Sequence, residues 1–448
     1  MVSIVKSTRR AVFVTKSVLA AKRSGYRLPP GQFDRLERLE KLDRHVILEK
    51  AKRFGSVFKS IWYERLVVCI TDLPTSLRFL RDNADDLRPI SLDLKALFPK
   101  GFIRTMEGET HRRYRGMLMK AIGGQLASVD EADLRAIIAD ALRDLSSNQD
   151  NGDLTPEALA RTLKQIAVGL LIRLLFDVDQ KSPLHADLVR KYQAISPEWF
   201  VWRVGEKQKI AFEAIRSAMT SHLSATGRSG ASRPLRDALQ SPESQGIVDE
   251  TALGNLIYMV EMGRYDIFGF FRWMIKDLAE NQDCLTRLSG LTGSKENQDL
   301  ANNFVQEALR MDQSERMIRR VERGFNWDGF HIPKGAYVRL SLWEPHKDPD
   351  VFEEPFVFDM DRFAGKSYSL DQYAPFGLDH HKCLAAQIVA KLGTLFVQEL
   401  AAGYGLSLVS DGPPVRQREI WEPNPKLSVH LSPRSAVAKR ASAANPLG

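Results

Sequence analysis

The chain has 448 residues, 44% of them hydrophobic, and a formal net charge of +8, so it is a folded protein rather than a disordered one. It contains three cysteines, Cys69, Cys284 and Cys383, which are odd in number and far apart in sequence. A disulfide framework and a cysteine-rich zinc module are therefore excluded, and a reducing, cytoplasmic location is expected. No uncharged apolar run reaches the length of about 18 residues that a transmembrane helix needs.

The positive charge is concentrated at the two ends of the chain. The first 32 residues carry seven lysines and arginines and no acid, the last 16 carry three, and the part between has a net charge of about −2. Apolar residues are interleaved with the cations of residues 1–32. We predict a basic arm there: an amphipathic helix that associates with a membrane surface, an organelle presequence or a disordered segment. No motif indicates nucleic-acid binding, so we expect none.

The body of the chain shows mostly helical periodicity. Leu28-Pro29-Pro30-Gly31 ends the arm and marks a boundary. A single domain is predicted over residues 33–432, followed by a flexible Ala/Ser-rich tail over 433–448. Within this domain we predict helices over residues 132–145, 154–176, 206–223 and 250–277, and strands within 57–71 and 336–343. The sum is a mainly α fold with a minor β region.

A glycine-containing loop precedes Cys383, and a helical pattern of apolar residues follows it. The loop reads Phe376-Gly377-Leu378-Asp379-His380-His381-Lys382-Cys383. Cys383 therefore lies at the entrance to a helix, where the helix dipole and the nearby His381 and Lys382 favour a thiolate. Backbone N–H groups of the loop can also point at the sulfur. Such a thiolate is either a nucleophile or a metal ligand.

Three kinds of site are open to this thiolate. A structural zinc site needs about four ligands, and His380, His381 and Cys383 are too close in sequence and lack partners. A cysteine hydrolase needs a separate histidine and an orienting Asn or Asp, and no local signature indicates one. Axial ligation of haem iron needs one thiolate only. For Cys69 and Cys284 we expect buried structural cysteines.

The loop resembles the haem loop of the cytochrome P450 superfamily, which reads Phe-x-x-Gly-x-Arg/His-x-Cys-x-Gly/Ala. Phe376, His381, Cys383 and Ala385 stand at matching positions. Asp379 replaces the usual glycine, so we expect an unusual backbone conformation there. The resemblance spans residues 28–432. It implies the P450 fold, with a large helical domain and a small sheet-rich lobe, haem b (iron protoporphyrin IX) as cofactor, Cys383 as the iron ligand and Phe376 as a haem contact.

The resemblance also implies a buried Glu–Arg–Arg network. Glu-x-x-Arg occurs four times in the chain, and only Glu307–Arg310 lies in the expected order before the haem loop. Arg362, in the segment before that loop, completes the implied network. For the two haem propionates the resemblance implies four cationic partners: His111, Arg115, Arg319 and His381. Arg320, next to Arg319, is an equally plausible candidate for the third of these positions.

The middle of the helix over 250–277 departs from the family. Family monooxygenases carry an acid–alcohol pair there that organises water and delivers protons. Here Gly263 is kept, which leaves room for oxygen or substrate, Tyr265 replaces the acid and Asp266 replaces the alcohol. Desolvation above a haem would raise the pKa of Asp266 and make it a proton donor. The simpler interpretation is sequence drift, with the water network repaired by Asp266 or by a substrate hydroxyl. For Arg264 we expect a pair with Glu261 one turn back, the alternative being recognition of a substrate carboxylate.

We therefore predict an oxidoreductase, a monooxygenase of secondary metabolism that inserts oxygen into or oxidises a small apolar organic molecule. Electrons would come from a separate partner such as a ferredoxin, which docks on a basic patch of Arg112, Arg113 and Lys382. A monomer is expected. The first alternative is a peroxygenase, isomerase or dehydratase of the same fold that does not activate O2 reductively. The second is a non-catalytic haem-binding paralogue.

Overall fold

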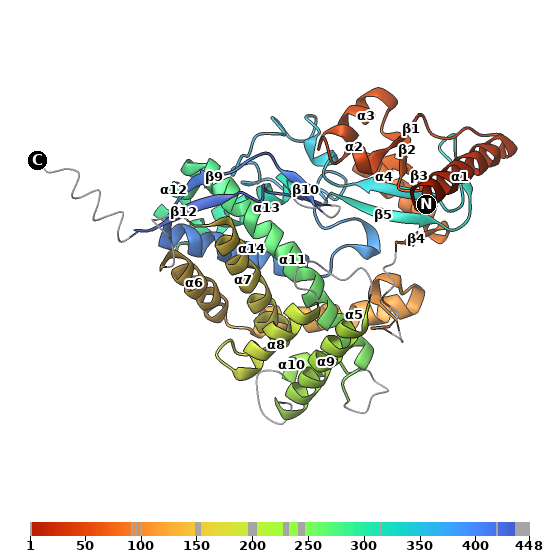
Figure 1. Cartoon of the computed structure of the whole chain (residues 1–448). Helices are drawn as coiled ribbons and strands as arrows, with labels where there is room; N and C mark the ends of the chain where they lie inside the picture. The colour runs from red at the N-terminus through yellow and green to blue at the C-terminus, as the bar shows by residue number, and fades with distance from the viewer. Residues whose placement is uncertain are drawn as a thin grey trace, which may run out of the picture.

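The computed structural model describes the chain except for residues 1, 91–93, 95, 99–100, 148–153, 196–203, 227–232, 241–246, 292, 313–314, 418–419 and 435–448. The predicted tail therefore falls almost wholly outside the described residues. A sheet-rich part lies at the upper right of Figure 1, and helices fill most of the rest. Among the described helices, none is long and apolar enough to cross a membrane.

The helices confirm the prediction of a mainly α protein, and the four predicted ones correspond to α6, α7, α9 and α11. Their bounds are α1 (Val2–Ser24), α2 (Leu36–Leu39), α3 (Val46–Phe54), α4 (Leu73–Asp82), α5 (Gly108–Ser128), α6 (Glu131–Ser147), α7 (Pro156–Phe176), α8 (Pro183–Ile195), α9 (Glu206–Thr226), α10 (Arg233–Ala238), α11 (Glu250–Glu280), α12 (Gln282–Gly290), α13 (Lys295–Met311) and α14 (Ala386–Gly403). Short 3-10 helices include η1 (Ala84–Asp86), η2 (Ile103–Thr105), η4 (Pro345–Lys347) and η5 (Asp379–His381).

The largest described sheet has six strands in the order β1-β2-β3-β8-β5-β4. The predicted strand region 57–71 is the antiparallel β2–β3 hairpin, and the region 336–343 contains β8, which pairs parallel to β3. The strand bounds are β1 (Gly31–Arg35), β2 (Val57–Trp62), β3 (Arg65–Ile70), β4 (Leu87–Pro89), β5 (Arg316–Val321), β6 (Phe325–Trp327), β7 (Phe330–Ile332), β8 (Tyr337–Ser341), β9 (Tyr404–Ser410), β10 (Val415–Gln417), β11 (Ile420–Glu422) and β12 (Ser428–Pro433).

Helix α11 runs diagonally through the middle of the molecule (Figure 1). Its start is capped by Asp249, whose side chain accepts hydrogen bonds from the backbone N–H groups of Thr251 and Ala252. Most of its side chains are buried on all sides, as expected for a helix that other elements surround. The helix therefore forms a fixed wall inside the molecule.

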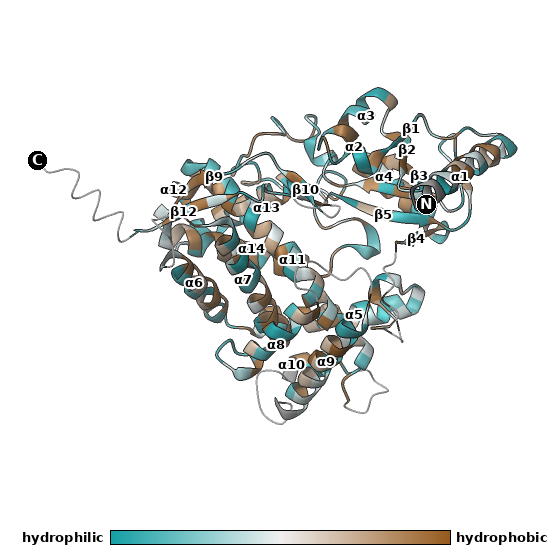
Figure 2. Cartoon of the chain, in the orientation of Figure 1, coloured by the Kyte–Doolittle hydropathy of each residue, from teal (hydrophilic) through white to brown (hydrophobic). Residues whose placement is uncertain are grey.

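Helix α1, which contains most of the predicted basic arm, packs on the sheet. Ser17 and Ala21 are buried, and Phe13 and Val14 pack against the hydrophobic cluster of the sheet. Val12 is exposed on the other side, and hydrophilic and hydrophobic residues alternate along this helix in Figure 2. Membrane association of the arm stays a prediction.

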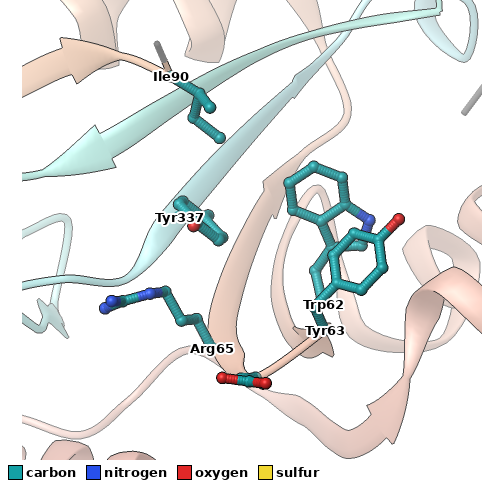
Figure 3. Close-up of a pocket in the computed structure, with 6 residues that line it drawn as sticks. Trp62, Tyr63, Arg65, Ile90 and Tyr337 are labelled. Carbon is teal, nitrogen blue, oxygen red and sulfur yellow. The ribbon is translucent and has the colours of Figure 1, made fainter. Parts of the chain in front are cut away.

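A hollow of about 260 Å³ opens beside the β2–β3 hairpin and β8 (Figure 3). It is lined by Trp62, Tyr63, Glu64, Arg65, Ile90 and Tyr337. No residue of the Cys383 loop contributes to it, so it is separate from the site that the sequence predicts.

Candidate haem-thiolate site

The loop before α14 holds Cys383 in a fixed position. The backbone N–H of Cys383 donates to the carbonyl of Phe376 at 2.8 Å and closes the loop. Gly377 has φ +86° and Asp379 has φ +61°, both in the left-handed region. The expected unusual backbone at Asp379 is thus confirmed, and aspartate is among the residues that tolerate it best.

The thiol of Cys383 does not have the lowered pKa that the sequence predicted. Burial raises its pKa and Asp266 adds to the rise, while a hydrogen bond from the backbone N–H of Ala385 and the charge of Arg115 lower it by less. The expectation was wrong because the desolvation of the sulfur outweighs the hydrogen bond from Ala385 and the charge of Arg115. A bound metal cation reverses this balance, since a coordinating thiol is deprotonated outright. Cys69 and Cys284 are buried as predicted, with pKa values raised to about 12 by burial.

The four residues predicted to bind the haem propionates gather beside the Cys383 loop. The rings of His111 on α5 and His381 lie 4.6 Å apart, and Arg115 donates to the carbonyl of Lys382 at 3.0 Å. Arg319 on β5 is buried, and its Nη2 atom has no hydrogen-bond partner among the described residues. Burial, reinforced by Arg319 and His111, lowers the pKa of His381 to about 3.

These residues fit the two propionates of a haem, the two arginines as cations and the two histidines as hydrogen-bond donors. A buried cation without a partner is costly, and a carboxylate at the unpartnered Arg319 nitrogen would satisfy it. The structure also distinguishes between Arg319 and Arg320, which the sequence left as alternatives for one propionate partner. The Arg319 side chain is buried, whereas Arg320 is half exposed and pairs with Glu322. The assignment of the four residues to the propionates stays a prediction that this geometry supports.

One face of α11 looks onto the same interior space. Along this buried helix, Met259, Met262, Gly263 and Asp266 keep accessible surface at spacings of three and four, so they share a face. Burial nevertheless raises the pKa of Asp266 to about 6, with Arg104 acting in the opposite direction. A side chain that is accessible yet desolvated lines an interior cavity. Cys383 is likewise accessible and desolvated, and its charge interacts with that of Asp266.

The other two residues predicted to act in catalysis are placed differently. Tyr265 is buried, and its hydroxyl accepts a hydrogen bond from Arg264 at 2.8 Å. Arg264 also pairs with the fully buried Glu261 at 3.0 Å, which confirms the predicted i,i+3 pair. A side chain added at Gly263 would approach Leu171 of α7 to 3.3 Å, so the glycine also permits close helix packing. Catalytic roles for Tyr265 and Gly263 stay predictions.

Arg104 on η2 belongs to the site, although no sequence motif indicated it. Its side chain is accessible, yet burial lowers its pKa, and the charges of Asp266 and Tyr258 act against this. Arg104 also contributes to lowering the pKa of Arg319 to about 10, after the larger effect of burial. The charge of Arg104 therefore interacts both with a predicted propionate partner, Arg319, and with Asp266 of α11.

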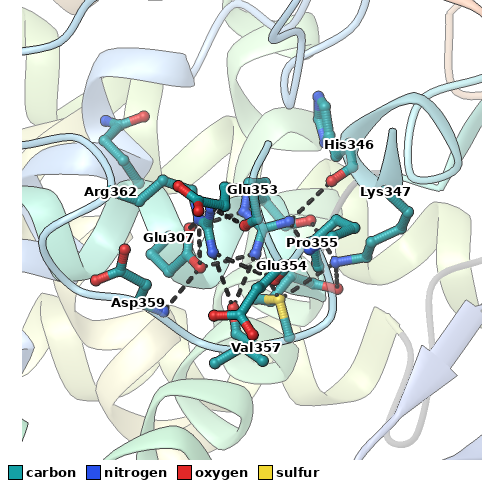
Figure 4. Close-up of polar contacts among 12 residues, drawn as sticks. Glu307, His346, Lys347, Glu353, Glu354, Pro355, Val357, Asp359 and Arg362 are labelled. Atoms are coloured by element: carbon teal, nitrogen blue, oxygen red, sulfur yellow. Dashed lines mark hydrogen bonds and ion pairs between the residues drawn. The ribbon is translucent and has the colours of Figure 1, made fainter. Parts of the chain in front are cut away.

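The predicted buried network is confirmed (Figure 4). Arg310 donates to both carboxylate oxygens of Glu307 at 2.7 Å, and Arg362 donates to them at 3.1 and 3.2 Å. The backbone N–H of Asp359 adds a further bond to Glu307 at 3.0 Å. Because these bonds join α13 to the segment before the Cys383 loop, the network holds that loop against the helical part.

Comparison with known proteins agrees with this site. Residues 295–390 match the sequence profile of the family described as Cytochrome P450. The chain is 22% identical over 414 residues to taxoid 7-beta-hydroxylase of Taxus cuspidata, covering 83% of this chain and 82% of that protein. It is 23% identical over 397 residues to abscisic acid 8'-hydroxylase 1 of Arabidopsis thaliana, covering 81% of each. The fold is similar to retinoic acid-bound cyanobacterial CYP120A1, with a TM-score of 0.71 and 19% identity, over 91% of this chain and 99% of that one.

Proposed function

The chain belongs to the cytochrome P450 superfamily, and we propose that it inserts oxygen into, or oxidises, a small apolar organic molecule. It is a haem-thiolate oxidoreductase whose cofactor is iron protoporphyrin IX. The bound haem supplies oxygen activation, and a thiolate ligand favours O–O cleavage. One observation supports the proposal: Cys383 and Asp266, on the accessible face of α11, are both accessible and desolvated, and their charges interact.

Each residue of this site has a proposed task. Cys383 ligates the iron, and Phe376 packs beside the cofactor. Asp266 holds a proton at its carboxyl group, within the space that Met259 and Met262 line with apolar surface. The propionate partners are the residues predicted from the sequence: His111, Arg115, Arg319 and His381. The remaining protein excludes water, which strengthens every one of these interactions.

Electrons come from a separate redox partner, for which we propose an acidic ferredoxin. Arg112, Arg113 and Lys382 are exposed, and Lys382 adjoins the iron ligand in sequence. A positive surface there would steer and hold an acidic protein. Peripheral membrane contact through α1 and a monomeric state are further parts of this proposal.

The candidate substrates include organic acids. Abscisic acid is named for the plant hydroxylase, and retinoic acid is named for the cyanobacterial structure. Both names belong to those proteins, and they suggest which compounds to test first on this chain.

Turnover of such compounds under three conditions tests the proposed reaction. With a reductase, a ferredoxin and NAD(P)H, we expect oxygenated product, whereas the protein with neither electron donor nor peroxide should form none. Product formed with hydrogen peroxide but not with the electron donor would assign a peroxygenase instead. Conversion that needs neither would assign an isomerase or dehydratase, and no conversion under any condition would leave a haem-binding protein.

Asp266→Asn is expected to lower the rate of product formation by about 10²-fold and to uncouple electron consumption from product. The carboxyl group donates its proton only while it is protonated, and burial raises its pKa to about 6. Product formed per electron in the wild type should therefore fall as the pH rises through about 6. The profile of Asp266→Asn should be flat. Both are measured as product per NAD(P)H between pH 5 and 8.

Two further variants accompany this measurement, one as a control and one as a test of Tyr265. Glu280→Gln, at the exposed end of the same helix, should keep the wild-type profile. Tyr265→Phe tests the other predicted catalytic side chain: lost coupling would support its role, and unchanged coupling would confine it to the buried contact with Arg264. A wild-type profile in Asp266→Asn would refute the proton-donor role.

A further inference from the structure

Arg104 is a cation with accessible surface on a short helix that packs against α11. No hydrogen bond or ion pair within 4.0 Å is made by its side chain to the described residues. The charge of Asp266 acts on the pKa of Arg104, but the two side chains do not form an ion pair. The guanidinium therefore keeps its five N–H donors for a ligand, and a desolvated guanidinium favours an anion that accepts two of them at once.

The short helix that bears Arg104 is fixed to α11. The backbone N–H of Ile103 donates to Asn255 Oδ1 at 2.8 Å, and Asn255 Nδ2 donates to the carbonyl of Gly101 at 3.3 Å. Asn255 is fully buried. Phe102 packs between Phe98 and Tyr258, with ring centroids 5.0 and 5.3 Å away. Arg104 is thus held on a rigid element beside an apolar wall, which limits the entropy lost on binding a ligand.

The position of Arg104 favours the substrate over the cofactor. Two arginines, Arg115 and Arg319, and two histidines already stand beside the Cys383 loop as partners for two propionates. The short helix that bears Arg104 is fixed to α11, and the charges of Asp266 and Tyr258 on that helix act on Arg104, which in turn acts on Arg319. Met259 and Met262, which share the accessible face of α11 with Asp266, are apolar. A cation at one end of an apolar surface matches a molecule with one carboxylate and a hydrocarbon body.

We propose that Arg104 binds the carboxylate of the substrate, and that the substrates of this protein are apolar monocarboxylic acids. This inference rests on the proposed function, because it assumes that the space between Cys383 and α11 receives the substrate. Arg104 acts as a binding residue that sets which carbon of the acid lies near the iron. It takes no part in the chemical step.

The test measures ligand binding by the shift in the haem absorption spectrum of the full-length, haem-loaded protein. The probes are tetradecanoic acid, a linear acid, and abietic acid, a polycyclic acid, each with its methyl ester. In the wild type, at least one acid should bind about 10- to 150-fold more tightly than its ester, as a charge-assisted hydrogen bond predicts. Arg104→Gln should remove this preference and leave the affinity of the ester unchanged, while Arg104→Lys should keep part of it. Arg320→Gln, at a half-exposed arginine paired on the surface, is the matched control and should behave as wild type.

Three results would overturn the proposal. The first is that neither acid binds more tightly than its ester in the wild type, and the second is that Arg104→Gln keeps the preference. The third is that Arg104→Gln loses haem faster than the wild type in transfer to apomyoglobin, which would make Arg104 a propionate partner. Binding needs no electron donor, so a preference for acids without turnover would count against the proposed reaction alone. Turnover of neutral compounds without any preference for acids would count against Arg104 alone.

Discussion

Glu307→Ala is expected to lower the free energy of unfolding by about 3–5 kcal/mol, the usual cost of removing one partner from a buried ion pair. Glu307 and Arg310 are fully buried, and Arg362 is 5% exposed. Removing the carboxylate leaves two guanidinium groups facing each other without a counter-ion. The loss is measured by urea unfolding, together with the fraction of purified protein that holds haem.

A second Glu-x-x-Arg pair in the chain provides the matched control. Glu213 and Arg216 on α9 have the same spacing, but their side chains are 53% and 33% exposed. Glu213→Ala should therefore cost at most about 1 kcal/mol. Equal losses in the two variants would show that the buried network contributes no more than a surface ion pair.

Cys383→Ser is expected to abolish the proposed oxygenation and to change the absorption spectrum of the reduced carbon monoxide complex. A serine hydroxyl does not supply the electron density of a thiolate to the iron. Cys69→Ala and Cys284→Ala remove the other two cysteines, which are buried away from the loop, and should keep the wild-type spectrum. All three variants are compared by this spectrum and by product formation.

Other outcomes of these spectra would change the assignment of the iron ligand or support it. A wild-type spectrum in Cys383→Ser would exclude Cys383 as the iron ligand. A spectrum that changes only in Cys69→Ala or Cys284→Ala would assign the ligand to that cysteine, despite its burial. Loss of haem from Cys383→Ser, with the controls fully loaded, would still place the cysteine at the cofactor.

Much of the site could be predicted because its parts are local in sequence. The Phe376–Cys383 loop, its left-handed Asp379 and the Glu307–Arg310 pair each depend on neighbours a few residues away. Helix α11 was predicted for the same reason, since apolar residues at spacings of three and four define its buried faces. Local spacing did not reveal which of its polar residues face the interior space.

Two features of the site could not be read from spacing. The pKa of the Cys383 thiol depends on how much protein surrounds the sulfur, and this burial outweighs the nearby cations that the sequence displays. Tyr265 and Asp266 are adjacent, yet one is held by Arg264 in a buried cluster and the other is accessible. One step along a helix turns a side chain by about 100°, and only the packing decides which direction meets the cavity.

The sequence by itself determined the helical character of the chain and the thiolate loop. It also indicated the propionate partners, through their order and spacing relative to that loop. The tertiary structure alone decided that Arg104, from a segment with no motif, interacts with the charge of Asp266 and has no ion-pair partner among the described residues. The physical reason is that a motif records contacts between neighbours along the chain. A charge in a cavity acquires its partners and its desolvation from elements that meet only when the chain folds.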